Sequence, residues 1–332
     1  MKNHTPPSAP SFRRTLLALG ALCLLATLAA PARAQGSYPS RPVKFINNFP
    51  PGGPSDILAR SIAEVLQTTL KQPFIVENKP GASGNIGTDV VAKSPADGYT
   101  VLIGIDTTFT VNPHIYKAMP FRVSDFKPLM ILASSGLLVG MHPATGIRSM
   151  RELVAAGKTR ALNFSSAGSG SPGHLAIEMF TEATGVKLNN ITYKGNSPAV
   201  TAILAGEVDG GMLATPGMLP YVKAGKITAL AVTSRQRSKL APELPTVAEA
   251  GLKDLEQEVL YVAMLPAATP DAVVQVLQRG FAEALARPDV QARMLNLDLQ
   301  PDGSTGAAMS KRLADMSERY SRTIRATGMK VE

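Results

Sequence analysis

Residues 166–173 read SAGSGSPG, and within them Gly168-Ser-Gly-Ser-Pro-Gly173 satisfies the pattern G-x-G-x-x-G. The stretch before it, ALNFS (161–165), is typical of a strand, and the stretch after it, HLAIEMFTEAT (174–184), is typical of a helix. A glycine-rich turn at this place exposes backbone N–H groups and the positive end of the helix, which together favour an anion. The segment therefore predicts an α/β fold and a negatively charged ligand.

A dinucleotide is the first candidate for this loop, because strand, G-x-G-x-x-G and helix are its local requirements. That site also needs an acidic residue about 20 positions further on, at the end of the next strand. Here the next strand ends Ile191-Thr-Tyr193-Lys194 without an acid, and Pro172 stands within the loop. We therefore expect neither a dinucleotide nor another cofactor.

The same arrangement occurs a second time near the start of the chain. The strand-like VKFINNF (43–49) leads into FPPGGPSD (49–56) and then into a helix-like stretch over about 55–70. If the two loops belong to two lobes, one anionic group could be held from both sides by backbone N–H groups, without an arginine. The alternative is that both are ordinary strand-to-helix connections, in which glycine is common.

Strands and helices alternate along the rest of the chain. Strands are expected at 74–78, 99–105, 137–143, 189–193, 208–213, 228–234 and 258–266, and later helices at 198–205, 270–286 and 304–327. The order predicts two α/β units with mostly parallel sheets covered on both faces. We place the strand crossings between them in ILASSGLLVG (131–140) and EVLYVAMLP (258–266). The expected lobes are residues 35–136 plus 262–332, and residues 137–261.

The first 34 residues have the pattern of a signal peptide. Arg13 and Arg14 precede the apolar run TLLALGALCLLATLAA (15–30), and Ala32-Arg-Ala34 supplies small residues for cleavage near Ala34/Gln35. A transmembrane anchor is the alternative, but the run is shorter than the roughly 20 residues that a spanning helix needs. The arginine pair leaves the Sec and twin-arginine routes open. Cys23, the sole cysteine, is expected to be one more apolar residue of the signal.

The charge of the exported chain is mildly basic. The leader holds four of the 34 Lys and Arg residues and none of the 25 Asp and Glu residues. The remaining basic residues are scattered, whereas nucleic acid would require a basic stripe. A mild positive charge suits attraction of anionic solutes. No later apolar run approaches membrane length, so we expect an exported monomer that binds no nucleic acid and is not embedded in a membrane.

Catalysis and metal binding have weak support in the sequence. The histidines His114, His142 and His174 lack metal-ligand spacing, so no metal site is expected. A secreted serine hydrolase could be imagined from Ser165, Ser166 or Ser169 with His174, but the glycines do not match G-x-S-x-G. His174 is more simply a residue that braces the loop or donates to a ligand. We expect no enzyme activity.

Several long motifs carry a family resemblance. They include YPSRPVKFINNFPPGGPSDILAR, VENKPGASGNIGTDVVAKSPADGYTVLIG, NFSSAGSGSPGHLAIEMF, YKGNSPAV, AGEVD and LAVTSRQRSKLAPELPTVAEAG. Together, and in this order, they resemble the substrate-binding proteins of tripartite tricarboxylate transporters, the Bug family. The resemblance implies a type II periplasmic binding-protein fold, in which two α/β lobes joined by two crossing strands close on a small carboxylated solute.

The resemblance also implies a location and partners. The receptor would work in the periplasm and deliver its ligand to an inner-membrane permease of one small and one large membrane subunit. A receptor that presents its ligand to a sensor kinase is the alternative. In the family the two glycine-rich loops hold a ligand carboxylate through backbone amides and bridging water; here these are the first loop, Phe49–Asp56, and the second loop, Ser165–His174.

Two segments depart from the family pattern, and both should face the cleft. The returning strand often carries a Trp in the family, whereas this chain reads Val259-Leu260-Tyr261 and contains no Trp. The segment after EVD reads Gly210-Gly211-Met212-Leu213-Ala214-Thr215, where the family shows apolar residues and then a polar one. The fold tolerates these changes, but the identity of the ligand stays open.

The segment DTTFTVN (106–112) follows the third strand, at the sheet edge where open α/β sheets bind ligands. Asp106 either caps a short helix or faces the ligand, where it would accept from an ammonium or hydroxyl group and repel a second carboxylate. As carboxylate donors we expect N–H groups of Gly52, Gly53, Ser169 and Gly170 and hydroxyls of Ser55, Ser166 and Ser171. The full set of expected site residues is Phe49, Pro51, Gly52, Gly53, Ser55, Asp56, Asp106, Thr107, Thr108, Asn112, Ser165, Ser166, Gly168, Ser169, Gly170, Ser171, His174, Tyr193, Ala214 and Thr215.

Overall fold

The computed structural model describes Met1 and residues 38–330. The expected signal peptide therefore lies outside the described residues, apart from Met1. Contacts separate Met1–Ser40 from Arg41–Glu332, and all of the elements below belong to the second of these units.

Two sheets organise this unit. The first has six strands in the order β11-β4-β10-β3-β1-β2. Its strands are β1 (Val43–Asn47), β2 (Phe74–Asn78), β3 (Thr100–Ile105), β4 (Phe126–Ser135), β10 (Val259–Pro266) and β11 (Gln300–Pro301). The second has five strands in the order β7-β6-β8-β5-β9. Its strands are β5 (Leu137–Met141), β6 (Asn163–Ser166), β7 (Asn189–Thr192), β8 (Gly210–Ala214) and β9 (Thr228–Val232). The expected pair of α/β lobes is confirmed.

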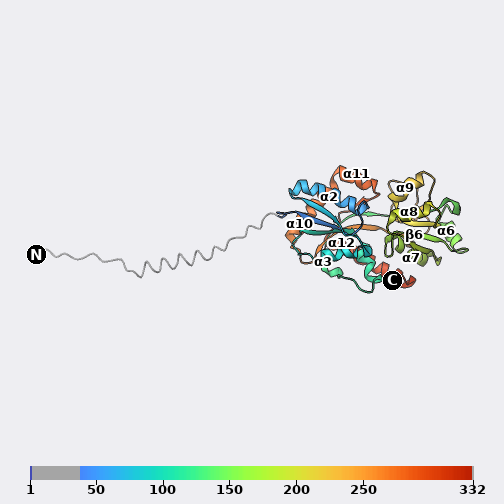
Figure 1. Ribbon diagram of the computed structural model, residues 1–332, viewed down its shortest axis with the longest axis horizontal. Helices are drawn as coiled ribbons and strands as arrows, with labels where there is room; N and C mark the ends of the chain where they lie inside the picture. The colour runs from blue at the N-terminus through green and yellow to red at the C-terminus, as the bar shows by residue number, and fades with distance from the viewer. Residues whose placement is uncertain (2–37, 331–332) are drawn as a thin grey trace. The chain divides into compact units, whose positions relative to one another are not determined.

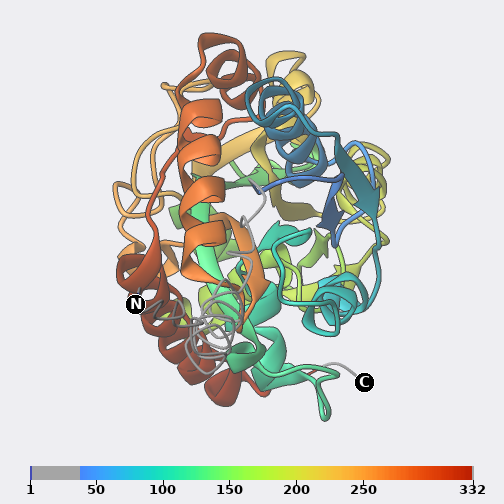
Figure 2. The same cartoon turned by 90° about the vertical axis from the view of Figure 1, so that its left-hand side faces the viewer.

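Helices cover both sheets, as Figure 1 shows. Those around the first sheet are α2 (Pro54–Leu70), α3 (Asn85–Ala92), α4 (Thr107–Thr110), α5 (Asn112–Ile115), α10 (Asp271–Ala286), α11 (Pro288–Asn296) and α12 (Gly306–Thr327). Those around the second are α6 (Met150–Gly157), α7 (Pro172–Thr184), α8 (Asn196–Leu204) and α9 (Thr215–Lys223). In Figure 2, α10 in orange and α12 in red lie beside the first sheet, where both pack on β4.

The central strands β3 and β10 of the first sheet are almost completely buried. Every residue of β10 is buried, and five of the six residues of β3 are buried, as expected for strands covered on both faces. Phe45 packs its ring against Phe74 and Phe281, with ring centroids 5.3 and 5.4 Å apart, and so joins β1 to β2 and α10. The core of this lobe is thus built from the apolar runs that identify its strands in the sequence.

The sheets are mixed rather than mostly parallel. In the first sheet β1, β2 and β3 are parallel, but β10 lies antiparallel between β3 and β4. In the second sheet β5 is antiparallel to both β8 and β9. The physical reason is that the chain leaves the first sheet through β4 and returns through β10, so the returning strand enters the sheet in the opposite direction.

The last helix contacts both lobes. Helix α12 packs on β4 and α4 of the first lobe and on α7 of the second. Thr323 donates a hydrogen bond of 2.5 Å to the Glu182 carboxylate on α7. The two lobes are therefore joined by α12 as well as by the strands β4–β5 and by the chain leading into β10.

Candidate functional site

The first glycine-rich loop is braced by a buried carboxylate. Gly52 has φ +79°, a backbone conformation that favours glycine, and Pro54 opens α2. The Asp56 side chain, 4% exposed, accepts hydrogen bonds from Gly52 N at 3.0 Å and from Asn78 Nδ2 at 2.9 Å, and it pairs with Arg60. Burial alone would raise the pKa of Asp56, but the hydrogen bonds from Arg60, Gly52 and Asn78 outweigh it and lower this pKa.

This brace changes the expected roles of two residues. The Gly52 N–H is already donated to Asp56, and the Asp56 carboxylate already has three donors. No described residue accepts a hydrogen bond from the N–H of Gly53, which precedes the helix N-terminus. Within this loop, Gly53 therefore fits the expected donor role and Gly52 does not. Phe49 acts through its carbonyl, which accepts from Asn47 and Asn78.

The second loop is braced by a histidine. Gly170 has φ +76°, and its N–H donates to His174 Nδ1 at 3.2 Å. Because Nδ1 accepts, the neutral ring carries its proton on Nε2, which lies 3.6 Å from Glu178 Oε1. Ser171 is the N-cap of α7, where its hydroxyl accepts from His174 N at 3.3 Å. His174 therefore braces the second loop, which is one of the two roles that the sequence leaves open for it.

Some of the expected donors of the second loop are used within the protein, and others are left without an acceptor. The Gly170 N–H is donated within the loop, and the Ser165 hydroxyl donates to Gly210 O at 3.4 Å. The Ser171 hydroxyl accepts from His174 N and keeps its own proton to donate. By contrast, Ser166 is fully buried, and its hydroxyl has no hydrogen-bond partner among the described residues. No described residue accepts from the N–H of Ser169 either. Within the described residues, the Ser169 N–H and the hydroxyl protons of Ser166 and Ser171 therefore have no acceptor.

The second loop touches the first lobe through a residue that sequence reasoning missed. Ser83, between β2 and α3, donates from Oγ to Ser169 O at 2.6 Å. Its hydroxyl also accepts from Tyr116 OH at 3.3 Å. Gln257 Nε2 donates to Pro172 O at 3.1 Å and forms a second tie to this loop. The available signal was the glycine-rich GASG (81–84), a third turn between a strand and a helix.

Asp106 is neither a helix cap nor an exposed acceptor. Its side chain makes no capping hydrogen bond to α4, and the residue is 0% exposed. Oδ1 accepts from Leu260 N at 2.8 Å, and Oδ2 accepts from Thr110 Oγ1 at 3.2 Å. Burial raises the pKa of Asp106 to about 7, although these hydrogen bonds oppose the shift. Asp106 thus joins the end of β3 to β10, and the capping expectation is wrong because β10 supplies a closer donor.

The other residues of segment 106–112 are buried as well. Thr107, Thr108 and Asn112 are at most 2% exposed. Thr108 Oγ1 donates to Ser83 O at 3.3 Å, and Asn112 Nδ2 donates to the same carbonyl at 3.0 Å. The segment therefore supports the turn that carries Ser83, and through it the contact with the second loop.

The remaining expected residues lie on the second lobe, apart from two in the first loop. The Tyr193 hydroxyl points to Glu207 Oε2 at 3.5 Å, and Ala214 N donates to Asn196 Oδ1 at 3.0 Å. Thr215 is fully buried at the start of α9. Of the first loop, Ser55 is buried and Pro51 exposed, while Gly168 of the second loop has φ +134°. In the returning strand, where the family often has a Trp, Tyr261 is 5% exposed, and burial raises its pKa to about 12.

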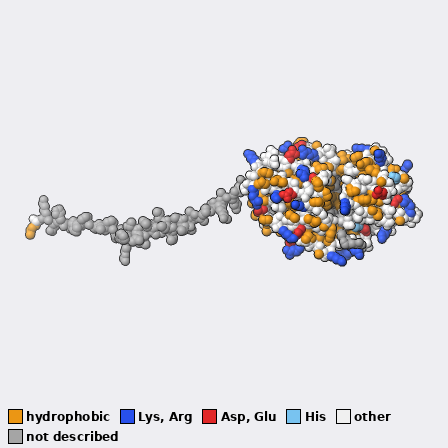
Figure 3. All heavy atoms as spheres, viewed as in Figure 1, with side chains coloured by type: hydrophobic (Ala, Val, Ile, Leu, Met, Phe, Trp, Pro, Cys, Tyr) orange, Lys and Arg blue, Asp and Glu red, His pale blue; other side chains and the backbone are white. Residues whose placement is uncertain are grey.

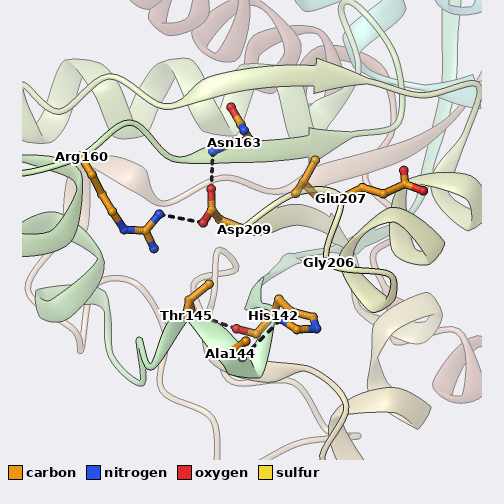
Figure 4. A pocket seen from close by; sticks show the side chains of 9 residues that line it. His142, Ala144, Thr145, Arg160, Asn163, Gly206, Glu207 and Asp209 are labelled. Atoms are coloured by element: carbon orange, nitrogen blue, oxygen red, sulfur yellow. Dashed lines mark hydrogen bonds and ion pairs between the residues drawn. The ribbon is translucent and has the colours of Figure 1, made fainter.

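A separate pocket of about 360 Å³ lies on the second lobe and contains none of the expected residues (Figure 4). Two of its charged groups, Arg160 and Asp209, are already paired, because Asp209 accepts from Arg160 at 2.8 Å and from Asn163 N at 2.8 Å. Asn163 begins β6, whereas the second loop follows the other end of this strand. This pocket is therefore distinct from the glycine-rich loops.

Acidic and basic side chains are mixed on the visible surface of the described chain. In Figure 3, Lys and Arg side chains are spread over the visible face among Asp and Glu side chains. None of the helices within the described residues combines the length and apolar character needed to cross a bilayer. In the same residues, no cluster of His, Cys, Asp and Glu could hold a metal ion.

Comparisons with known proteins identify the class and then the family. Residues 58–329 match the model of the tripartite tricarboxylate transporter family receptor. The chain is 34% identical to Protein BugT of Bordetella pertussis (strain Tohama I) over 323 residues, which cover 96% of this chain and 99% of that protein. Two solved structures are also similar. The periplasmic binding protein BugD is 31% identical with a TM-score of 0.79, covering 89% of this chain and 100% of that one. R. palustris Rpa4515 with adipate is 30% identical with a TM-score of 0.81, covering 88% and 99%.

Two α/β lobes with these neighbours define a solute-binding protein of the periplasmic binding-protein fold. The chain belongs to the tripartite tricarboxylate transporter receptor family, to which the Bug proteins belong. It is thus a solute-binding receptor of a periplasmic family, and its relatives are binding proteins rather than enzymes.

Proposed function

We propose that this receptor captures a small carboxylated compound between its two lobes and delivers it to the membrane subunits of a tripartite tricarboxylate transporter. The observation that carries the proposal is the pair of strand–loop–helix turns. Each keeps an N–H group, at Gly53 and at Ser169, that finds no acceptor among residues 38–330. Helix N-termini with free N–H groups stabilise anions without a basic side chain. The adipate-bound relative supports a carboxylate as the ligand class.

The proposed carboxylate contacts are narrower than the sequence suggested. We propose that Gly53 N, Ser169 N and the Ser166 hydroxyl contact the carboxylate, directly or through water. Each charge-assisted hydrogen bond of this kind contributes about 1.5–3 kcal/mol. Asp56 and His174 would hold the loops in shape, because the Asp56 carboxylate and His174 Nδ1 accept hydrogen bonds within the loops. The Ser171 hydroxyl caps α7 and keeps its own proton for a ligand.

A ligand screen tests the carboxylate. Melting temperatures would be measured with succinate, citrate, adipate, aspartate, nicotinate and aromatic acids, each beside its neutral amide. The acids that bind should raise the melting temperature and their amides should not, because a neutral amide offers no full negative charge to the N–H groups. Equal shifts with acid and amide would contradict the carboxylate site. Ser166→Ala should weaken binding about tenfold by calorimetry.

Delivery and lobe closure need separate tests. We propose that residues 35–136 plus 262–332 close against residues 137–261, so small-angle scattering should show a smaller radius of gyration with saturating ligand. Delivery predicts uptake of labelled ligand into vesicles that contain both permease subunits, only when the receptor is added. A receptor that closes on its ligand and supports no uptake would instead serve a sensor.

A further inference from the structure

In the Asn112 side chain the NH₂ group is hydrogen-bonded, whereas the carbonyl oxygen has no donor among the described residues. Asn112 is 0% exposed, and its Nδ2 donates to Ser83 O at 3.0 Å and to Asn85 Oδ1 at 2.8 Å. Its Oδ1 is buried and has no hydrogen-bond partner among the described residues. A buried acceptor without a donor destabilises the folded chain, so a structure that keeps one requires an explanation.

The orientation of this side chain is determined by the backbone. Ser83 O is a carbonyl oxygen and can only accept, so the NH₂ group of Asn112 must face it. Turning the carboxamide over would set two oxygens against each other. Asn85 agrees with this orientation, because its own NH₂ group lies 3.6 Å from Met119 Sδ and leaves its oxygen toward Asn112. Oδ1 of Asn112 is therefore a fixed acceptor.

The unsatisfied oxygen faces the second glycine-rich loop. A Cβ built on Gly170 would lie 3.4 Å from Asn112 Oδ1 and 3.2 Å from Ser83 Oγ. The loop does not satisfy this oxygen, because the Gly170 N–H is donated to His174. The adjacent Ser169, whose carbonyl accepts from Ser83, has a free N–H group. The acceptor thus lies beside a proposed carboxylate donor, where the two lobes touch.

We propose that Asn112 Oδ1 selects ligands that carry a hydrogen-bond donor, a hydroxyl or ammonium group, close to the bound carboxylate. The proposal rests on the carboxylate function above and specifies the class of carboxylate. A deoxy ligand would bury this oxygen without a donor, and sites built to bind a hydroxyl group reject analogues that lack it. Because a carboxamide is neutral, it does not repel a second carboxylate, so hydroxylated and aminated di-acids fit as well as mono-acids.

Matched pairs of ligands test the selection in the wild-type protein by calorimetry. The pairs are lactate with propionate, malate with succinate, and 2-aminoadipate with adipate. In the pair that binds most tightly, the member with the donor should bind about tenfold or more tightly, since one net hydrogen bond is worth about 1.4 kcal/mol. Equal affinity within every pair, as when a water molecule satisfies Oδ1, would overturn the proposal.

Asn112→Leu keeps the approximate size of the side chain and removes its acceptor. The ratio of the two affinities within the pair should fall toward one, mainly because the hydroxylated or aminated member binds more weakly. Asn48→Leu is the matched control. Asn48 is also fully buried and donates from Nδ2 to Thr88 Oγ1, but its Oδ1 faces β3, where a Cβ on Gly104 would lie 2.5 Å from it. This control should keep the preference. An unchanged preference in Asn112→Leu would reject the assignment.

The outcomes separate this inference from the proposed function. If carboxylates bind and the members of each pair are equal, only the role of Asn112 is lost. If none of the carboxylates binds, the carboxylate function fails together with the inference. If Asn112→Leu does not fold, the comparison of pairs in the wild-type protein still decides.

Discussion

The two glycine-rich loops have the same order of strand, turn and helix, but different groups hold them. The first loop is fastened within its own lobe by Asp56, Arg60 and Asn78. The second loop is fastened by His174 and also by hydrogen bonds from Ser83 and Gln257, which lie outside its sheet. The first loop therefore keeps its shape independently of the other lobe, whereas the position of the second depends on how the lobes meet.

The largest expected effect comes from replacing a loop glycine by valine, because the two loops differ in backbone conformation. Valine at position 170 would need φ near +76°, and its Cβ would lie 2.8 Å from Ile115 Cδ1. Gly53 has φ −78°, and the nearest atom to its Cβ position is Pro50 O at 3.7 Å. Gly170→Val should therefore cost about 2–4 kcal/mol of stability and abolish measurable binding.

Gly53→Val should fold almost as well as the wild type and lose affinity only through obstruction of the ligand. Thermal unfolding and calorimetry on both variants make the comparison. Equal loss of stability in the two variants would show that the loops are constrained alike.

The second-largest expected effect follows from removing the Asp56 brace of the first loop. Asp56→Ala takes the acceptor from Gly52 N, Asn78 and Arg60, and should lower the free energy of unfolding by about 1–3 kcal/mol in urea denaturation. The matched control is Asp315→Ala, which breaks an exposed pair with Lys311 and should cost about 0.5 kcal/mol or less. If Asp56→Ala were as mild as the control, the first loop would not depend on this brace.

A smaller effect is expected at the contact between the lobes. Ser83→Ala removes the 2.6 Å hydrogen bond to Ser169 O and keeps the left-handed backbone (φ +52°), which alanine already adopts at Ala82. Ligand affinity should fall about three- to tenfold, because closure loses one hydrogen bond, while the stability of each lobe changes little.

Calorimetry measures this difference, with Ser94→Ala as the control. The Ser94 hydroxyl donates within its own lobe to Val90 O, so this variant should bind ligand as the wild type does. Unchanged affinity in Ser83→Ala would show that the second loop is positioned without the first lobe.

The last expected effect appears only when the pH changes, and it concerns Asp106, which joins the end of β3 to β10. Because burial raises its pKa to about 7 from 3.8, the folded protein keeps a proton that the unfolded chain has already released. The contribution of Asp106 to stability therefore falls as pH rises from about 4 to about 7, and then levels off.

Asp106→Asn cannot ionise and can still accept from Leu260 N, so its stability relative to the wild type should increase over this pH range. Melting temperatures measured at several pH values test the slope. A constant difference between the two proteins would mean that Asp106 does not change its protonation on folding.

Local pattern explains how much of the fold could be predicted. The strand at 74–78 and the helix at 270–286 match β2 and α10 within a residue, because apolar periodicity and turn residues are local properties. Helix α11 and the start of β4 at Phe126 were missed. Helix α11 buries only Val290 and Met294, and β4 contains Pro128, so neither presents a long regular pattern.

The site was predictable to a lesser extent, for a related reason. The glycines and the helix N-termini indicate anion-binding turns, but the sequence does not show which N–H groups the protein itself uses. Gly52 and Gly170 have the expected residue type, yet Asp56 and His174 occupy their N–H groups. A hydrogen-bond donor becomes available to a ligand only when no neighbour in the folded chain accepts from it.

The sequence by itself determined the family, the two α/β lobes and the two glycine-rich loops, because motifs and periodicity depend on residues close together along the chain. Tertiary structure alone decided the contact between Ser83 and Ser169, which are 86 positions apart, and the burial of Asp106 against β10. It also decided that Asn112 turns an unsatisfied oxygen toward the second loop. Those features depend on which distant backbone carbonyl or N–H group packing brings within about 3 Å, and no local pattern records that distance.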